Sequence, residues 1–184
     1  MHKDEIWQLY YPNGEAIPGK GWPAERNNPK GDDTEIVGVA IVFLFRRGDD
    51  GGLELLWQRR SDTIDRYPGD YDISAGGHIN LGESIVEAAM RESREEIGAV
   101  LEPSELGFVT MYPFNKNRFA WIFAADWTGK TEEFHFDDKE VSEVRWVALS
   151  KTDEFRQEFA KKPLKEDPVT FETLKYWFKI HGYL

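Results

Sequence analysis

The chain has 184 residues, of which 40% are hydrophobic and 31% are charged, with a formal net charge of −11 at pH 7. This length suits one domain with a substantial core, and the acidic balance excludes a general nucleic-acid-binding surface, which needs a basic face. The sequence has no Cys, which excludes a disulfide framework, a thiolate zinc site and a cysteine nucleophile.

The sequence has neither the apolar region of a signal peptide at its N-terminus nor an apolar run long enough for a membrane helix. We therefore expect a cytoplasmic protein that binds no membrane. Internal repeats are absent, so residues 1–184 are predicted to form a single domain. Residues 1–33 form an N-terminal arm in this interpretation, and residues 150–184 form C-terminal helices.

The arm is expected to contain a β-hairpin. Glu5–Tyr11 alternates as a strand does, and Pro12–Glu15 is a strong turn signal. Pro18–Asp33, which is rich in Gly, Pro and Asn, is predicted to be a loop. The arm is therefore expected to extend a sheet, and a dimer contact or a cover over the substrate is the alternative.

Two central strands are predicted next. Ile36–Phe45 is nearly continuous in β-branched and aromatic residues, which is typical of a strand buried on both faces. Leu53–Arg60 returns as its partner, and Ser61–Ser74 is predicted to be mostly loop.

A Gly-rich turn followed by a helix comes after this loop. Gly76 and Gly77 are expected to lie in the turn, Glu83 or Ser84 to begin the helix, and Gly98 to end it. This helix is the segment with the clearest chemistry.

Three helix carboxylates, Glu92, Glu95 and Glu96, are spaced i, i+3 and i+4. At about 100° per residue they share one arc with the apolar residues of the preceding turns, so the inward face becomes acidic. Clustered carboxylates at the edge of a core repel one another, and a hard divalent cation offsets that cost. The spacing therefore predicts a Mg²⁺ or Mn²⁺ site. The alternative is a solvated acidic face, although Arg91 among the carboxylates, with Glu83 as its partner, favours the site.

Further strands are predicted over Glu105–Tyr112, Arg118–Trp127 and Val141–Leu149. Pro113–Asn117 is expected to turn the chain between the first two, and Thr128–Asp138 is a polar segment that we expect to be mobile.

Helices are predicted over Lys151–Lys161 and Pro168–His181, and the second has a wide apolar surface suited to a core or a dimer contact. The order of elements predicts an α/β fold with a mixed sheet and helices on both faces.

The helix region resembles the Nudix box, G-x(5)-E-x(7)-R-E-U-x-E-E-x-G-U, where U is a bulky aliphatic residue. All fixed positions match at the spacing of the family, whereas Ser93 and Ala99 stand at the U positions. The matching residues are Gly77, Glu83, Arg91, Glu92, Glu95, Glu96 and Gly98.

The resemblance implies an α/β/α sandwich and hydrolysis of a small-molecule diphosphate, such as a nucleoside diphosphate derivative, by water attack at phosphorus. It implies metal ligands at Glu92, Glu95 and Glu96 and at the carbonyl oxygen of Gly76. It also implies that Glu83 and Arg91 form a structural ion pair, and family members often pair, which favours a homodimer.

The general base is left open between a box residue, Glu92, and a distal acid, Glu140, which precedes the last strand. The secondary distal candidates are Glu132, Glu133 and Glu143. An ordinary solvated loop acid is the alternative interpretation of Glu140.

Candidates for binding substrate phosphates are Arg60, Lys116 and Arg118, since strand ends and loops above a metal site suit a phosphate. Each is alternatively a surface charge, because exposed Arg and Lys are common. His78 beside the Gly turn is interpreted as a hydrogen-bonding loop residue and stays outside the ligand set.

Arg60, Pro68–Gly69 and Gly76–His78 are similar to the subgroup of Nudix proteins related to isopentenyl diphosphate isomerase. The isomerase activity itself is disfavoured, because that enzyme needs a Cys where Gly76 stands. A Nudix domain that binds a nucleotide without cleaving it is the remaining alternative, although no box carboxylate is lost.

Overall fold

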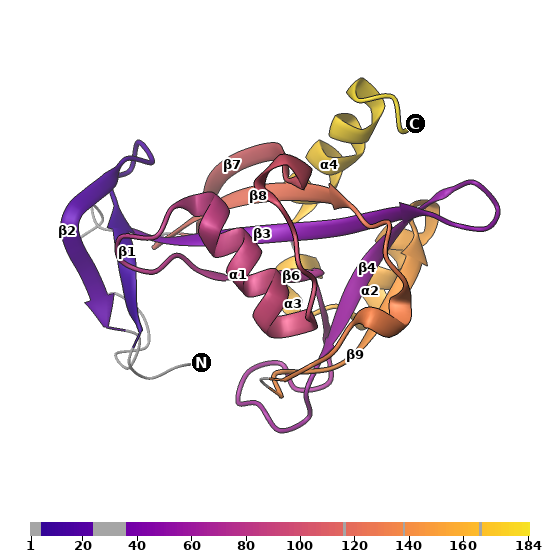
Figure 1. Cartoon of the computed structure of the whole chain (residues 1–184), viewed down its shortest axis with the longest axis horizontal. Helices are drawn as coiled ribbons and strands as arrows, with labels where there is room; N and C mark the ends of the chain where they lie inside the picture. The colour runs from indigo at the N-terminus through magenta and orange to yellow at the C-terminus, as the bar shows by residue number, and fades with distance from the viewer. Residues whose placement is uncertain (1–4, 24–35, 116, 138, 166) are drawn as a thin grey trace.

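The computed structural model describes residues 5–23, 36–115, 117–137, 139–165 and 167–184, arranged in three layers (Figure 1). A mixed sheet forms the middle layer, and α1 (Ile85–Ile97) packs against one face. The other face is covered by α2 (Thr152–Phe159), α3 (Lys162–Lys165) and α4 (Pro168–Ile180). This arrangement confirms the predicted fold class.

The described residues contain nine strands in one sheet. They are β1 (Ile6–Tyr10), β2 (Ala16–Pro23), β3 (Ile36–Arg47), β4 (Leu53–Arg60), β5 (Tyr71–Asp72), β6 (Ala75–His78), β7 (Gly107–Asn115), β8 (Arg118–Asp126) and β9 (Val141–Ala148). The order β2-β1-β3-β4-β5 is extended by β6 and β8, which pair with β3, by β7 on β8, and by β9 on β4. The β3–β8 pair is parallel and the other pairs are antiparallel.

The long strand β3 is the centre of the sheet because it contributes to a core on each face. Successive side chains of a strand point to opposite faces. Ala40, Val42 and Leu44 belong to the core beneath α1, whereas Phe43 and Phe45 belong to the core beneath α2 to α4. The prediction of a strand buried on both faces is confirmed, and the strand continues to Arg47.

The ends of α1 follow from its sequence. Ser84 is the N-cap and forms a capping box with Glu87, and Gly98 ends the helix with a left-handed φ of 72°. Replacing such an N-cap typically costs about 1 kcal/mol. Ala88, Ala89 and the other small or apolar residues of its inner face are buried against the sheet. The helix is therefore held at both ends and along one side.

The C-terminal helix α4 contributes an aromatic core. Phe171, Leu174 and Phe178 are buried, whereas Tyr176 and Ile180 are exposed. Phe171 stacks on Trp57 with ring centroids 5.6 Å apart. Within the described residues, no helix is both long and apolar enough to cross a membrane.

Several predicted boundaries were wrong. The loop predicted from Pro18 begins later, since β2 extends to Pro23. Residues 24–33 of that loop lie outside the described residues. The predicted turn at Pro113–Asn117 also begins later, because β7 continues through Asn115.

Gly76 and Gly77 lie in strand β6 and not in a loop. The backbone of β6 pairs with β3. The sequence does not indicate this strand, because neither glycine has a side chain that could contribute to a strand pattern. The polar segment after β8 contains a 3-10 helix, Thr131–Glu133, and Phe134 next to it is buried.

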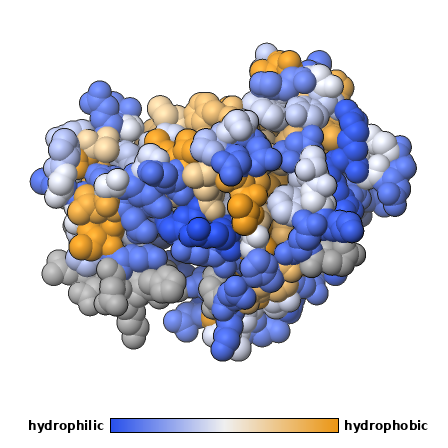
Figure 2. Space-filling view, viewed as in Figure 1, coloured by the Kyte–Doolittle hydropathy of each residue, from blue (hydrophilic) through white to orange (hydrophobic). Residues whose placement is uncertain are grey.

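The face that carries α1 is predominantly hydrophilic, with separate hydrophobic patches (Figure 2). The N-terminal hairpin of β1 and β2 lies at one end of the sheet, beyond the N-terminal end of α1 (Figure 1). The candidate site lies where α1 faces the edge of β6.

Candidate active site at the edge of strand β6

The close approach of β6 to α1 depends on Gly77. A Cβ atom at Gly77 would lie 2.2 Å from Glu92 Oε1, well inside van der Waals contact. The register Ala40↔Gly77 places this position on the α1 face of the sheet. Glycine therefore lets the Glu92 carboxylate lie directly against the β6 backbone.

Glu96 lies deepest of the three carboxylates, with 8% of the residue exposed. Its Oε2 accepts a hydrogen bond from the backbone N–H of Gly76 at 2.9 Å and another from Gln58 Nε2 at 3.1 Å. Burial and the neighbouring Glu92 raise the pKa of Glu96 well above its usual value, against the effect of these hydrogen bonds. A negative charge is therefore costly here without a further cation.

The orientation of Gly76 follows from the same hydrogen bond. Its N–H points to Glu96 and so away from β3. In an antiparallel pair, the N–H and C=O of one residue point to the same side. The Gly76 carbonyl therefore also faces the edge of β6 on which Glu96 lies.

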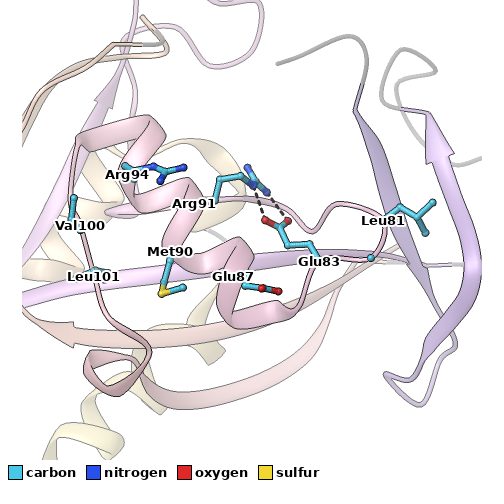
Figure 3. Close-up of a pocket in the computed structure, with 9 residues that line it drawn as sticks. Leu81, Glu83, Glu87, Met90, Arg91, Arg94, Val100 and Leu101 are labelled. Atoms are coloured by element: carbon cyan, nitrogen blue, oxygen red, sulfur yellow. Dashed lines mark hydrogen bonds and ion pairs between the residues drawn. The ribbon is translucent and has the colours of Figure 1, made fainter.

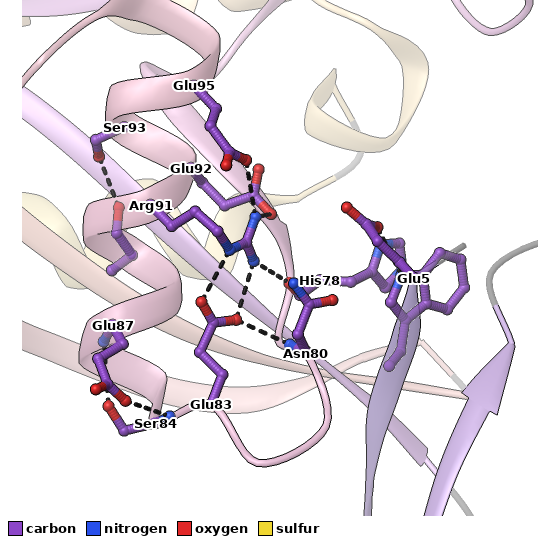
Figure 4. Close-up of polar contacts among 12 residues, drawn as sticks. Glu5, His78, Asn80, Glu83, Ser84, Glu87, Arg91, Glu92, Ser93 and Glu95 are labelled. Atoms are coloured by element: carbon purple, nitrogen blue, oxygen red, sulfur yellow. Dashed lines mark hydrogen bonds and ion pairs between the residues drawn. The ribbon is translucent and has the colours of Figure 1, made fainter. Parts of the chain in front are cut away.

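Arg91 joins the other acidic groups into one network (Figure 4). Its Nε and Nη2 donate to the two oxygens of Glu83 at 2.8 and 3.0 Å. Its Nη1 donates to Glu92 at 2.8 Å and to Glu95 at 3.1 Å, and its Nη2 also donates to the carbonyl of His78 at 2.9 Å. Arg91 thus fixes the start of α1, the middle of α1 and the end of β6 relative to one another.

Glu92 and Glu95 differ in environment. Burial raises the pKa of Glu92 to about 7, although Arg91 opposes the shift. The side chain of Glu92 is 13% exposed and that of Glu95 is 38% exposed. Glu95 is therefore the carboxylate with most freedom to turn.

The donor set fits a hard divalent cation, because carboxylate oxygens and a backbone carbonyl are the ligands that Mg²⁺ and Mn²⁺ prefer. In the part of the chain that the structure describes, no three acidic or His side chains already form a metal-ligand group. Arg91 Nη1 instead lies between Glu92 and Glu95. A cation bound there would have to replace or share these contacts.

Two of the predicted phosphate-binding residues have different surroundings. Arg60 forms an ion pair with buried Asp72 at 3.2 Å, and Lys161 binds the same carboxylate. Arg118 begins β8, and its Nε is buried without a hydrogen-bond partner among the described residues. Lys116 lies outside the described residues.

The distal acids lie near strand β9. The carbonyl of Glu140 accepts a hydrogen bond from the Ser61 N–H at 2.7 Å. Glu143 accepts a hydrogen bond from the Tyr71 hydroxyl, and burial together with this bond raises the pKa of Tyr71 to about 12. Glu133 is exposed, and the side chain of Glu132 lies outside the described part. Among these distal acids, the Glu143 carboxylate is therefore already engaged in a hydrogen bond with Tyr71.

His78 has a role in the site that sequence reasoning missed. Its ring stacks on Trp7 of β1, with centroids 3.6 Å apart and planes at 7°. Burial, followed by the charges of Arg118, Arg91 and Arg66, lowers the pKa of His78 to about 3. Its neutral ring therefore attaches the N-terminal hairpin to β6, a contact that no local pattern signals.

A hollow of about 590 Å³ lies along the outer flank of α1 (Figure 3). It shares Glu83 and Arg91 with the network, but its lining includes none of Glu92, Glu95 and Glu96. The other lining residues are Leu81, Gly82, Glu87, Met90, Arg94, Val100 and Leu101. The hollow is therefore separate from the carboxylate cluster.

Comparison with known proteins identifies the fold and the family. DR0079 from Deinococcus radiodurans has a similar structure, with a TM-score of 0.66 and 24% identity over 88% of this chain and 96% of that one. The NUDIX domain of NrtR from Shewanella oneidensis, complexed with ADP ribose, gives a TM-score of 0.59 and 15% identity over 85% of this chain and 94% of that one. At such identities the likeness shows the fold alone.

Sequence relatives are named Nudix hydrolases. The uncharacterized Nudix hydrolase YfcD of Escherichia coli K12 is 35% identical over 133 residues, which are 71% of this chain and 67% of that protein. Nudix hydrolase 3 of Arabidopsis thaliana is 31% identical over 127 residues, which are 63% of this chain and 16% of that protein. The NUDIX domain family matches residues 34–167. The chain therefore belongs to the NUDIX domain family, as a Nudix hydrolase.

Proposed function

We propose that this chain is a Mg²⁺- or Mn²⁺-dependent hydrolase that cleaves a diphosphate linkage by attack of water at phosphorus. The observation that carries the proposal is the group of Glu92, Glu95 and Glu96 around the polar backbone edge of Gly76. These residues would hold the cation. When bound, the cation would neutralise charge on the phosphate oxygens and lower the pKa of a bound water.

The residues of the chain divide the remaining work. Arg91 and Glu83 position α1 against β6 through their bidentate ion pair. We propose that Glu92 or Glu140 accepts the proton of the attacking water. The water oxygen forms a bond to phosphorus, the bridging P–O bond breaks, and the leaving phosphate takes the electron pair.

We propose a nucleoside diphosphate derivative as the substrate, with its phosphates near Arg118 and Lys116. Lys116 is a candidate from the sequence and lies outside the described residues. Arg60 is a weaker candidate because Asp72 already neutralises it. Isopentenyl diphosphate isomerase activity is disfavoured, since Gly76 stands where that enzyme needs a thiol.

We also propose that the chain acts as a homodimer in the cytoplasm and that residues 1–184 form a single domain. Tyr176 and Ile180, one turn apart on α4 and 64% and 58% exposed, support a self-association surface. Light scattering after gel filtration tests the dimer, and a monomeric mass at micromolar concentration would refute it.

The test of function is product release from a panel of nucleoside diphosphate derivatives, with and without Mg²⁺ or Mn²⁺. Glu96→Gln keeps the shape of the side chain and removes its charge, so turnover should fall on the order of 10²-fold or more. Glu158→Gln, an exposed acid on α2, is the matched control and should retain wild-type turnover.

Equal turnover of Glu96→Gln and wild type at saturating metal would contradict the metal assignment. Cleavage that needs no divalent cation would contradict the proposed mechanism. Binding without cleavage of any compound would favour the alternative of a nucleotide-binding domain.

A further inference from the structure

Strand β4 carries a polar side chain into the layer beneath α1. Leu56 belongs to the hydrophobic cluster beneath α1, and Trp57 belongs to the cluster on the other face. Because the side chains of a strand alternate between the two faces, Gln58 lies on the α1 face with Leu56. Gln58 is only 2% exposed, so the protein encloses its amide group. An amide in such a place needs a partner, because burying an unpaired polar group is unfavourable.

The backbone at Gln58 is held from both sides. On one edge of β4, Gln58 pairs with Asp72 of β5, and on the other edge it pairs with Val144 of β9. The sheet therefore fixes the point from which the side chain starts, and only the rotations of the side chain itself are left. Strand β4 is thus a rigid support for the group that the Gln58 amide contacts.

The partner of the Gln58 amide is the Glu96 carboxylate. Gln58 Nε2 donates to Glu96 Oε2 at 3.1 Å, and the backbone N–H of Gly76 donates to the same oxygen at 2.9 Å. Glu96 is therefore held between β4 and β6. Its other oxygen, Oε1, accepts no hydrogen bond from the described residues and is accessible to solvent. The two oxygens thus differ, because the protein binds Oε2 and leaves Oε1 open.

The other half of the Gln58 amide shows what sets its orientation. Gln58 Oε1 is buried and has no hydrogen-bond partner among the described residues. If the amide were turned over, Gln58 Oε1 would face Glu96 Oε2, and two acceptors would lie together. The contact with Glu96 therefore sets the orientation and leaves a buried carbonyl unpaired. An apolar side chain of similar length would fill this position without that penalty, so stability alone does not account for a glutamine here.

We propose that Gln58 is a positioning residue that holds Glu96 by Oε2 and leaves Oε1 for the cation. This assignment rests on the proposed function, in which Glu96 is a metal ligand. Arg91 holds Glu92 and Glu95 in place. Within the described residues Arg91 donates no hydrogen bond to Glu96, so Gln58 does for Glu96 what Arg91 does for the other two acids. A ligand that is already oriented loses less side-chain freedom when the cation binds.

The test measures Mn²⁺ binding by electron paramagnetic resonance, with no substrate present. Gln58→Met keeps the length of the side chain and removes the donor, so the Kd for Mn²⁺ should rise about tenfold or more. The melting temperature of the metal-free variant should equal or exceed that of wild type, because the unpaired carbonyl is gone. A merely structural role for Gln58 predicts the opposite pattern, with a lower melting temperature and an unchanged Kd.

Gln157→Met is the matched control, because it makes the same substitution in the opposite layer. Gln157 lies on α2, and its Nε2 donates to the Lys165 carbonyl at 3.0 Å. This variant also loses one amide hydrogen bond and should bind Mn²⁺ as wild type does. Gln58→Asn serves if Gln58→Met does not fold, as judged by thermal melting. It keeps the amide but is one methylene shorter, so it should not reach Glu96 and should raise the Kd about fivefold or more.

Equal Mn²⁺ affinity in wild type and a folded Gln58 variant would overturn the positioning role. An equal rise in Kd for Gln157→Met would also overturn it, because the loss of any amide hydrogen bond would then have this effect. Failure of both Gln58 variants to fold would make Gln58 a structural residue and would overturn it as well. Failure of the proposed function is distinguishable, since wild type would then bind no Mn²⁺ or Glu96→Gln would bind Mn²⁺ as tightly as wild type.

Discussion

At Gly77 the backbone of β6 passes directly beside the carboxylate of Glu92, and the missing side chain is what makes this contact possible. The same arrangement leaves the Gly76 N–H to bind Glu96. A carboxylate can lie this close to a backbone only where the residue beside it has no Cβ atom. The geometry of the site is therefore set as much by the two glycines as by the acids.

Gly77→Ala should separate the role of shape from the role of charge. The new methyl group would lie 2.2 Å from Glu92 Oε1, so Glu92 must move. A displacement of about 1 Å in a catalytic group can cost on the order of 10²-fold in rate, and we expect a loss of that size. Steady-state turnover, with thermal melting to verify folding, is the measurement.

Gly52→Ala is the matched control for Gly77→Ala. Gly52 has no left-handed φ, and the atom nearest to its added Cβ is in the flexible Asp50 side chain at 3.0 Å. It should retain wild-type activity. Wild-type kinetics in Gly77→Ala would show that the close contact is dispensable.

The sequence predicts some residues of the site better than others for a physical reason. Glu92, Glu95 and Glu96 share a helix, so their spacing alone places them together. The Trp7–His78 stack, by contrast, joins residues of β1 and β6 that only the folded sheet brings near. Local periodicity contains no information about such pairs.

Among the elements, those with strong local signals were predicted closely. The strand predicted at Leu53–Arg60 has these bounds in the structure, and α1 ends at Gly98 as expected. The short strand β6 was missed because Gly76 and Gly77 suggest a turn, whereas pairing with β3 imposes an extended backbone. Tertiary pairing thus overrode local preference.

Helices α2 and α4 are joined by an ion pair whose strength depends on pH. Lys175 Nζ lies 2.6 Å from Asp153 Oδ2, and Arg156 lies 3.3 Å from the other oxygen. The hydrogen bond from Lys175 is the main reason that the pKa of Asp153 lies below its ordinary value. A depressed pKa stabilises the fold above the ordinary value of about 3.9, and this contribution is lost as the pH falls through the folded pKa.

Asp153→Asn should therefore lower the free energy of unfolding at pH 6 and have a smaller effect at pH 3. The pair is half exposed, so the difference at pH 6 should be about 0.2–1 kcal/mol. Urea unfolding at both pH values is the measurement, with Asp65→Asn in the exposed loop as the control. An effect of the same size at both pH values would contradict the ion-pair explanation.

For the whole molecule, β3 connects every hydrophobic cluster of the described residues. Val37 belongs to the hairpin cluster, Leu44 to the cluster beneath α1, and Phe45 to the cluster beneath α4. If one cluster unfolds, β3 loses the packing on part of its surface, and the other clusters pack on the same strand. The sheet should therefore unfold as one cooperative unit.

Unfolding in urea, followed by tryptophan fluorescence and by far-ultraviolet circular dichroism, should give coincident transitions. Tryptophans report from all three clusters, since Trp7, Trp57 and Trp121 belong to different ones. Two separated transitions would refute the single-domain proposal. Repeating the unfolding measurement at two protein concentrations, which favour the monomer and the dimer respectively, controls for dissociation of the dimer.

The two faces of β3 also limit how this chain can change over evolutionary time. Inserting or deleting one residue within the strand would turn every following side chain to the opposite layer. Phe43 and Phe45 would then face the small alanines of α1, and Ala40 and Val42 would face the aromatic layer. Length variation among descendants should therefore accumulate in the connections on either side of β3, while the strand itself tolerates exchange of residues but no change in their number.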